Sequence, residues 1–122
     1  MADTSCECKG GSIILFPCSG GSNVGQIANA AAVGLTQQQK GNMYCLIGVA
    51  AHIAGMVDST AGADYRVVID GCPTACGRKA LEHLGLKVDK AVVVTDFGIQ
   101  KNHDFVWSSD ELERVMAAAT LS

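Results

Sequence analysis

The sequence lacks a long hydrophobic run and a marked excess of charge of either sign. Its least polar long stretch, residues 45–56, is shorter than the roughly 20 residues that a helix needs to cross a bilayer, and it contains His52 and two glycines. The net charge of −3 gives no electrostatic reason to expect binding to nucleic acid. We therefore expect neither a membrane span nor a nucleic-acid partner.

The N-terminal residues also lack the basic start and the apolar centre of a secretory signal peptide, so we expect a cytoplasmic protein. Residues 1–11 are polar and glycine-rich and are expected to form a flexible arm that carries Cys6 and Cys8. Residues 12–122 are expected to form a single domain, because a chain of 122 residues with 48% hydrophobic residues can bury one core.

Cysteine is the residue type that the chain has in excess, with six in 122 residues. In a small secreted domain this number would suggest a disulfide framework. Cytosolic thiols are kept reduced, however, so a cysteine cluster there is more often metal-binding or catalytic. The positions of the cysteines relative to the strands therefore decide whether they can act together as one site.

Apolar runs and helical periodicity alternate along the chain, which predicts a parallel sheet with helices on both faces. Right-handed crossovers leave few topologies, and we favour strand order 2-1-3-4 in a three-layer, flavodoxin-like α/β fold of the Rossmann type. The expected strands are residues 12–17, 43–47, 65–69 and 90–95. The expected helices begin near Ser22, Gly48, Cys72 and Ser108.

Several residues predict where these helices begin and end. Ser22 or Asn23 can cap the first helix, and Ser108 with Glu111 forms a capping-box pattern at the start of the last one. Gly85 is expected to end the third helix in the left-handed conformation, with Leu86 folding back as its hydrophobic partner. In the second helix, Val49, His52, Ile53, Met56 and Val57 are expected to share one apolar face, with His52 as a core histidine.

Residues 67–77 organise the rest of the chain. A buried strand leads into Asp70 and Gly71, which we read as a turn, and Pro73 fits the first turn of a helix. Cys72 would then lie at a helix N-terminus, with Cys76 one turn further along the same face. A helix N-terminus favours the thiolate form of cysteine, so this corner suits metal or sulfur chemistry.

Four cysteines fall near the carboxyl ends of three strands that are neighbours in the expected order. Cys18 ends the first strand, Cys45 lies late in the second, and Cys72 and Cys76 follow the third. Four sulfurs about 2.3 Å from one ion make a tetrahedral zinc site. The alternative is that some are ordinary buried thiols, and for Cys45 this is nearly as well supported.

Three motifs in order resemble the DGC-domain family of zinc-binding proteins. They are Phe16-Pro17-Cys18-Ser19-Gly20, Cys45-Leu46 before a glycine-containing helix, and Asp70-Gly71-Cys72-Pro73 with Cys76. The resemblance runs from about Cys6 to the last helix. It implies a zinc site drawn from Cys18, Cys45, Cys72 and Cys76, and it implies little about activity. We therefore expect a zinc-binding protein whose zinc has a structural or sensing role.

The main alternative is a thiol-based redox or sulfur-transfer protein in which Cys72 is the nucleophile and Cys76 the resolving thiol. A phosphatase of the C-x5-R type is excluded, because no arginine lies near Gly25 to clamp an oxyanion. The glycines that follow Cys18 match no nucleotide-binding motif and are expected to permit a tight turn and close helix packing. Asp96 could support a metal ligand, although a turn is the better interpretation.

Overall fold

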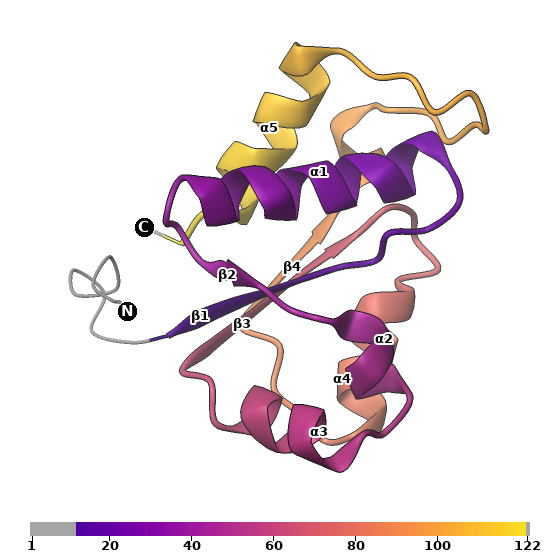
Figure 1. Ribbon diagram of the computed structural model, residues 1–122. Coiled ribbons are helices and arrows are strands. Elements are labelled where there is room, and N and C mark those ends of the chain that lie inside the picture. The colour runs from indigo at the N-terminus through magenta and orange to yellow at the C-terminus, as the bar shows by residue number, and fades with distance from the viewer. Residues whose placement is uncertain (1–11, 122) are drawn as a thin grey trace.

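A computed structural model describes residues 12–121. The sheet has four strands: β1 (Ile13–Pro17), β2 (Asn42–Met43), β3 (Tyr65–Asp70) and β4 (Lys90–Val93). They are all parallel in the order β2-β1-β3-β4, which confirms the predicted topology (Figure 1). The expected flexible arm with Cys6 and Cys8 lies outside the described residues and stays a prediction.

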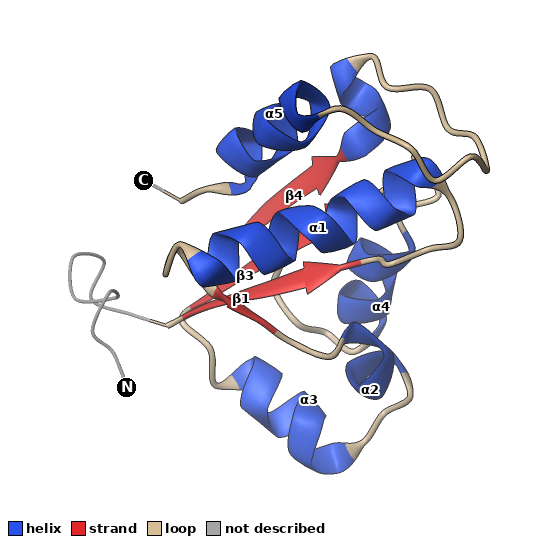
Figure 2. Cartoon of the chain, turned by 45° about the horizontal axis from the view of Figure 1, so that its top comes forward, coloured by secondary structure: helices blue, strands red, loops and turns tan. Residues whose placement is uncertain are grey.

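Helices cover both faces of the sheet, as expected for three layers (Figure 2). One face carries α1 (Asn23–Gln37) and α5 (Ser109–Ala119), and the other carries α2 (Leu46–Ala50), α3 (Ala54–Ala61) and α4 (Cys76–His83). A 3₁₀ turn, η2 (Val94–Phe97), follows β4. No helix among residues 12–121 is both long enough and apolar enough to cross a membrane.

The central strands build two hydrophobic cores because successive side chains on a strand point to opposite faces. In β1, Leu15 packs under α1 and α5, while the neighbouring Phe16 packs on the α2–α4 side. In β3, Val67 and Ile69 join the first core and Val68 the second. Both faces are covered, which explains why these strands are apolar without a polar alternation.

The predicted helix caps are confirmed. The Ser22 hydroxyl accepts a hydrogen bond from the backbone N–H of Gly25, and Ser108 and Glu111 form a complete capping box. Gly85 is left-handed, with φ 74°, and the N–H of Leu86 returns to a carbonyl of α4. These local signals are readable from sequence because each cap pairs a side chain with a backbone group only a few residues away.

The second strand and the second helix were predicted with the wrong bounds. The strand covers Asn42–Met43 instead of residues 43–47, and Cys45 is the residue before α2. His52, with φ 65°, divides the expected single helix into α2 and α3, and both His52 and Ile53 are exposed. A left-handed residue ends a helix, so the expected apolar face stops there, and His52 is not a core histidine.

Two element ends near the cysteines also differ from expectation. The third helix begins at Cys76 instead of Cys72, because Ala75 takes a left-handed conformation, φ 52°, and Cys72–Thr74 form a turn. Cys72 and Cys76 therefore do not share a helix face. The fourth strand ends at Val93, since the chain tightens into η2, and the exposed Asp96 lies in that turn.

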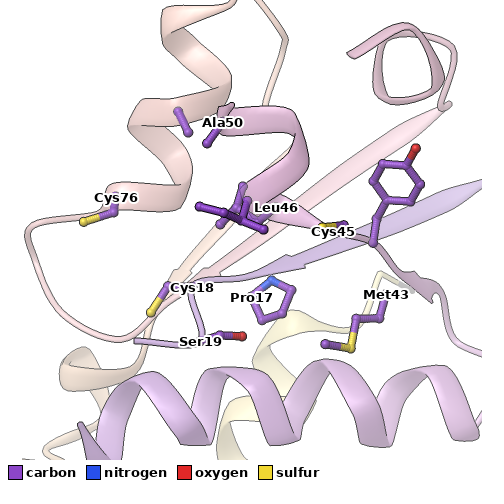
Figure 3. Close-up of a pocket in the computed structure, with 11 residues that line it drawn as sticks. Pro17, Cys18, Ser19, Met43, Cys45, Leu46, Ala50 and Cys76 are labelled. Carbon is purple, nitrogen blue, oxygen red and sulfur yellow. The ribbon is translucent and has the colours of Figure 1, made fainter. Parts of the chain in front are cut away.

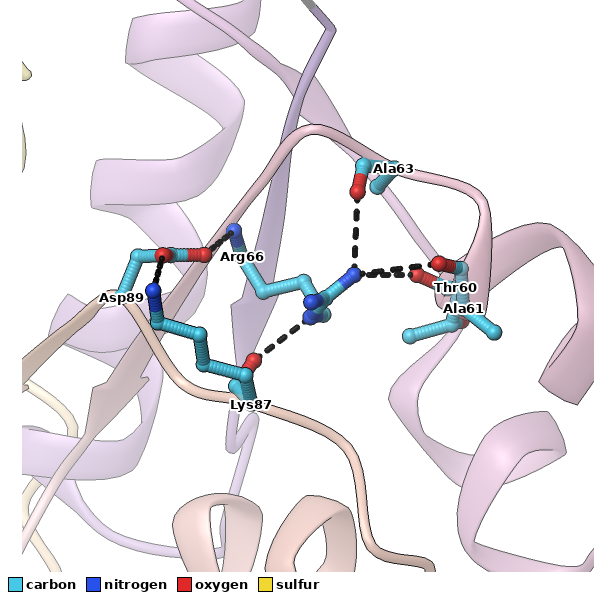
Figure 4. A network of polar contacts seen from close by, with 6 residues as sticks. All are labelled: Thr60, Ala61, Ala63, Arg66, Lys87 and Asp89. Carbon is cyan, nitrogen blue, oxygen red and sulfur yellow. Dashed lines mark hydrogen bonds and ion pairs between the residues drawn. The ribbon is translucent and has the colours of Figure 1, made fainter.

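Arg66 in β3 ties the amino-terminal edge of the sheet together (Figure 4). Its guanidinium donates hydrogen bonds to four carbonyl oxygens, those of Thr60, Ala61, Ala63 and Lys87. Its backbone N–H also donates to a carboxylate oxygen of Asp89, at 2.8 Å. One side chain thus joins the end of α3 to the segment that leads into β4.

Replacing Arg66 with lysine should lower the free energy of unfolding by about 1–3 kcal/mol, because several carbonyl groups lose their donor. The lysine keeps the charge but lacks the forked guanidinium. Urea unfolding of both proteins measures the difference. The matched control is Lys87→Met, which removes the Lys87–Asp89 ion pair, whose lysine side chain is 75% exposed, and should cost less than about 1 kcal/mol. Equal losses in the two variants would contradict the assigned role.

Candidate thiol site at the carboxyl edge of the sheet

The four cysteines of interest all follow strands, at the carboxyl edge of the sheet. Cys18 comes directly after β1, and its N–H donates to the carbonyl of Ile69 at 3.0 Å, which continues the pairing of β1 with β3. Cys72 lies in the turn after β3, Cys76 begins α4, and Cys45 precedes α2. Cys18 and Cys72 are half-buried, whereas Cys45 and Cys76 are exposed.

Three of these cysteines line one pocket of about 370 Å³: Cys18, Cys45 and Cys76 (Figure 3). In this view Cys18 and Cys76 point to the same side, and Leu46 lies between them and Cys45. The sulfur of Cys45 lies 3.4 Å from the position that a Cβ would take on Gly48, so it faces its own helix. Cys72 does not line this pocket.

The arrangement of these sulfurs does not match an assembled zinc site. Within residues 12–121, no three side chains from His, Cys, Asp and Glu lie close enough to hold one metal ion. A tetrahedral site needs four sulfurs about 2.3 Å from the metal. The thiols are the right donors for zinc, but they would have to move together to form such a site.

Three glycines bring the loops of this edge into backbone contact. A Cβ on Gly25 would lie 2.4 Å from the carbonyl oxygen of Gly20, and a Cβ on Gly71 would lie 2.8 Å from the backbone nitrogen of Gly25. No larger residue fits at either position without a shift of the backbone. The start of α1, the loop after β1 and the loop after β3 are therefore packed against one another, which confirms the expected close packing and sets Cys18 beside the turn of Cys72.

Asp70 holds the start of α4 and is more than a turn residue. Its carboxylate is buried, and it accepts hydrogen bonds from the N–H groups of Gly77 at 2.8 Å and Arg78 at 3.1 Å. A carboxylate at a helix N-terminus satisfies free N–H donors and complements the helix dipole. The end of β3 is thereby linked to the first turn of α4, which fixes both ends of the turn that carries Cys72.

The surroundings of Cys72 favour its thiolate. Hydrogen bonds from the side chain and the backbone of Thr74 lower the pKa of Cys72, and the nearby ammonium of Lys101 lowers it further. The Lys101 Nζ lies 3.8 Å from the sulfur of Cys72. A thiolate, unlike a thiol, is a strong nucleophile and a metal ligand.

Cys18 has the opposite electrostatic environment. Burial raises the pKa of Cys18, and the charges of Asp70 and of the Cys72 thiolate raise it further, against hydrogen bonds from Gly20 and Gly71 that lower it. The N–H of Gly20 donates to the Cys18 sulfur at 3.3 Å. The site therefore combines one cysteine whose pKa is lowered, Cys72, with a neighbouring cysteine whose pKa is raised, Cys18.

Asn23 places Lys101 over Cys72. The buried Asn23 makes three hydrogen bonds to the segment on either side of Lys101: its side chain donates to the Gln100 carbonyl and accepts from the Asn102 N–H, and its backbone N–H donates to the Asn102 carbonyl. These bonds measure 2.7 to 3.0 Å. A loop far along the chain is thus anchored at the start of α1.

The sequence profile of the DGC domain matches residues 14–119, which is most of the chain. This chain belongs to the DGC-domain family. It is also similar to the "Anaerobic and virulence modulator AnvM" of Pseudomonas aeruginosa strain PAO1, with 26% identity over 102 residues, which cover 84% of this chain and 78% of AnvM. No solved structure matches the chain. The resemblance seen in the cysteine motifs is therefore confirmed at the level of the family.

Sequence reasoning missed three residues of this DGC-domain site: Thr74, Lys101 and Asn23 in its anchoring role. Thr74 lies within residues 67–77, but nothing in the sequence indicates its hydrogen bonds to Cys72. Asn23 was expected only as a helix cap. Lys101 gives no local signal at all, because its place beside Cys72 depends on tertiary hydrogen bonds made by its neighbours.

Removing the groups that stabilise the Cys72 thiolate should raise the pKa of Cys72. Thr74→Val, which removes the side-chain hydrogen bond and keeps the backbone one, and Lys101→Met, which removes the positive charge, should each raise it. The pH dependence of alkylation of Cys72 by iodoacetamide, followed by peptide mass spectrometry, reports this pKa, because only the thiolate reacts.

The exposed Lys40→Met serves as the control that removes one positive charge elsewhere. It should leave the alkylation profile of Cys72 in place. A profile that stays unchanged in both Thr74→Val and Lys101→Met would contradict the electrostatic assignment.

Proposed function

We propose that this protein is a thiol-based regulatory protein whose reactive group is the Cys72 thiolate. The observation that carries the proposal is the gathering of Thr74 and the Lys101 ammonium around the half-buried Cys72, with a second thiol, Cys18, alongside. The name of the similar protein AnvM describes a modulator, which supports a regulatory role over a metabolic one. In a reducing cytoplasm both thiols would begin reduced.

The proposed chemistry is thiol–disulfide exchange with a small disulfide as oxidant. The Cys72 thiolate attacks one sulfur of that disulfide, whose S–S bond breaks and releases one thiolate. Cys18 then loses its proton to solvent and attacks the Cys72 sulfur of the mixed disulfide, which expels the second thiolate. Two cysteines are oxidised to one disulfide, and the small disulfide is reduced to two thiols.

The sequence suggests Cys76 as the resolving thiol, but Cys18 suits this role better. The spacing of Cys72 and Cys76 predicts one shared helix face, but Cys72 lies in the turn before α4. Cys18 and Cys72 are close enough for the charge of one to raise the pKa of the other, and both loops meet at the glycine contact. This placement supports the proposed pairing of Cys18 with Cys72.

Treatment of the reduced protein with oxidised glutathione should produce a disulfide between Cys18 and Cys72, detected by mass spectrometry of unreduced peptides. Cys18→Ser should stop the reaction at the mixed disulfide on Cys72, because the resolving thiol is absent. Cys76→Ser is the matched control and should still form the internal disulfide. A disulfide between Cys72 and Cys76, with Cys18 left free, would refute the assignment.

The second candidate function is zinc binding through Cys18, Cys45, Cys72 and Cys76. Its support is the set of four thiols at one edge, three of which line one pocket, together with membership of the DGC-domain family. A zinc ion held by four thiolates has no open position, which suits a structural or sensing role better than hydrolysis.

Cys45→Ser separates the two candidates. If the four cysteines hold zinc, this substitution should remove one ligand and lower zinc affinity sharply, as measured by competition with a chromogenic chelator. If exchange at Cys72 is the function, the same variant should form the disulfide between Cys18 and Cys72 at the wild-type rate. If Cys45→Ser keeps its zinc affinity but loses disulfide formation, Cys45 is not a zinc ligand and does take part in the exchange. That result would contradict both candidates as stated.

A further inference from the structure

Two histidines lie side by side where the turn after α2 meets the last residue of α4. His52 is in the turn between α2 and α3, and His83 is the last residue of α4. The centroids of their rings are 5.7 Å apart, and the ring planes are inclined by 32°. Both side chains are exposed, so an ion from solvent can reach them. They are distinct from the cysteine edge and have no part in the exchange chemistry.

The backbone holds His52 in an uncommon conformation. Its φ of 65° is left-handed, a region that few residues other than glycine occupy. The N–H of His52 donates to the Val49 carbonyl at 2.9 Å, and the next N–H, that of Ile53, donates to the Gly48 carbonyl at 3.1 Å. Both hydrogen bonds return to carbonyl groups of α2, so the turn is fixed against that helix, and the imidazole of His52 lies next to His83 of α4 without being buried.

The ring separation agrees with two imidazoles on one metal ion. A metal–nitrogen bond of about 2.0–2.1 Å puts each ring centroid about 3.2 Å from the ion. Two such rings would then be about 4.5 Å apart at a right angle and about 6.4 Å apart when opposite. The observed 5.7 Å falls between these limits. Neutral imidazole is the commonest protein ligand for zinc and related ions.

We propose that His52 and His83 together bind one divalent transition-metal ion of the zinc class, with water in the remaining coordination positions. Along α4, Cys76 and His83 are seven residues apart, which corresponds to about 10 Å of helix. One ion therefore cannot bridge this pair and the cysteines. The site is separate from both candidate functions of the cysteine edge, and its test does not depend on either.

A titration of the reduced, untagged protein with Zn²⁺, followed by NMR of the imidazole ring protons, tests the proposal. The chain has three histidines, so His52→Asn, His83→Gln and His103→Gln assign the three sets of signals. We expect the signals of His52 and His83 to shift together and saturate at one ion per pair. His103, in an exposed loop, should not follow them. If only cysteines bind zinc, the signals of His52 and His83 will not shift together, which would contradict the proposal.

Replacement of either member of the pair should weaken Zn²⁺ binding at the other by about tenfold or more. His103→Gln is the matched control and should have no effect. Asparagine tolerates the left-handed conformation, so His52→Asn keeps the turn, and His83→Gln supplies the same readout from the surface of α4. Equal shifts of all three histidines, or unchanged binding at His83 in His52→Asn, would overturn the proposal.

Discussion

The backbone contact among Gly20, Gly25 and Gly71 is the constraint on which the site depends. Any Cβ at Gly25 or Gly71 would lie under 3 Å from backbone atoms of the facing loop, a separation that packed atoms do not tolerate. The loops after β1 and β3 therefore meet at the start of α1 in one arrangement. Cys18 and Cys72 belong to these two loops, so their proximity follows from glycine packing and requires no disulfide or metal.

Two buried polar side chains extend this contact into a rigid site. Asp70 joins the end of β3 to the first turn of α4, and Asn23 joins the start of α1 to the loop that carries Lys101. Each replaces water by hydrogen bonds to backbone groups, which a buried polar side chain needs in order to be tolerated. Asp70 thereby fixes the turn that carries Cys72, and Asn23 places the positive charge of Lys101 beside the Cys72 sulfur.

The order of the strands could be predicted from sequence because it depends on the alternation of strands and helices along the chain. The helix caps could also be predicted, since their partners are near in sequence. Cys45 was misplaced because a short apolar run such as residues 43–47 has no periodicity that distinguishes a strand from a helix. Cys72 was placed in a helix because nothing local indicates that Ala75 is left-handed, and Lys101 depends on contacts made through Asn23.

The central proposal is that Cys72 is the most reactive thiol of the four cysteines at this edge. The most direct measurement is a timed thiol titration, paired with elemental analysis, on protein purified without added metal. We expect Cys72 to react ahead of the other thiols before any chelator is added, because its pKa is lowered. About one zinc per chain, with four thiols that react only after chelation, would contradict it and establish the zinc site instead.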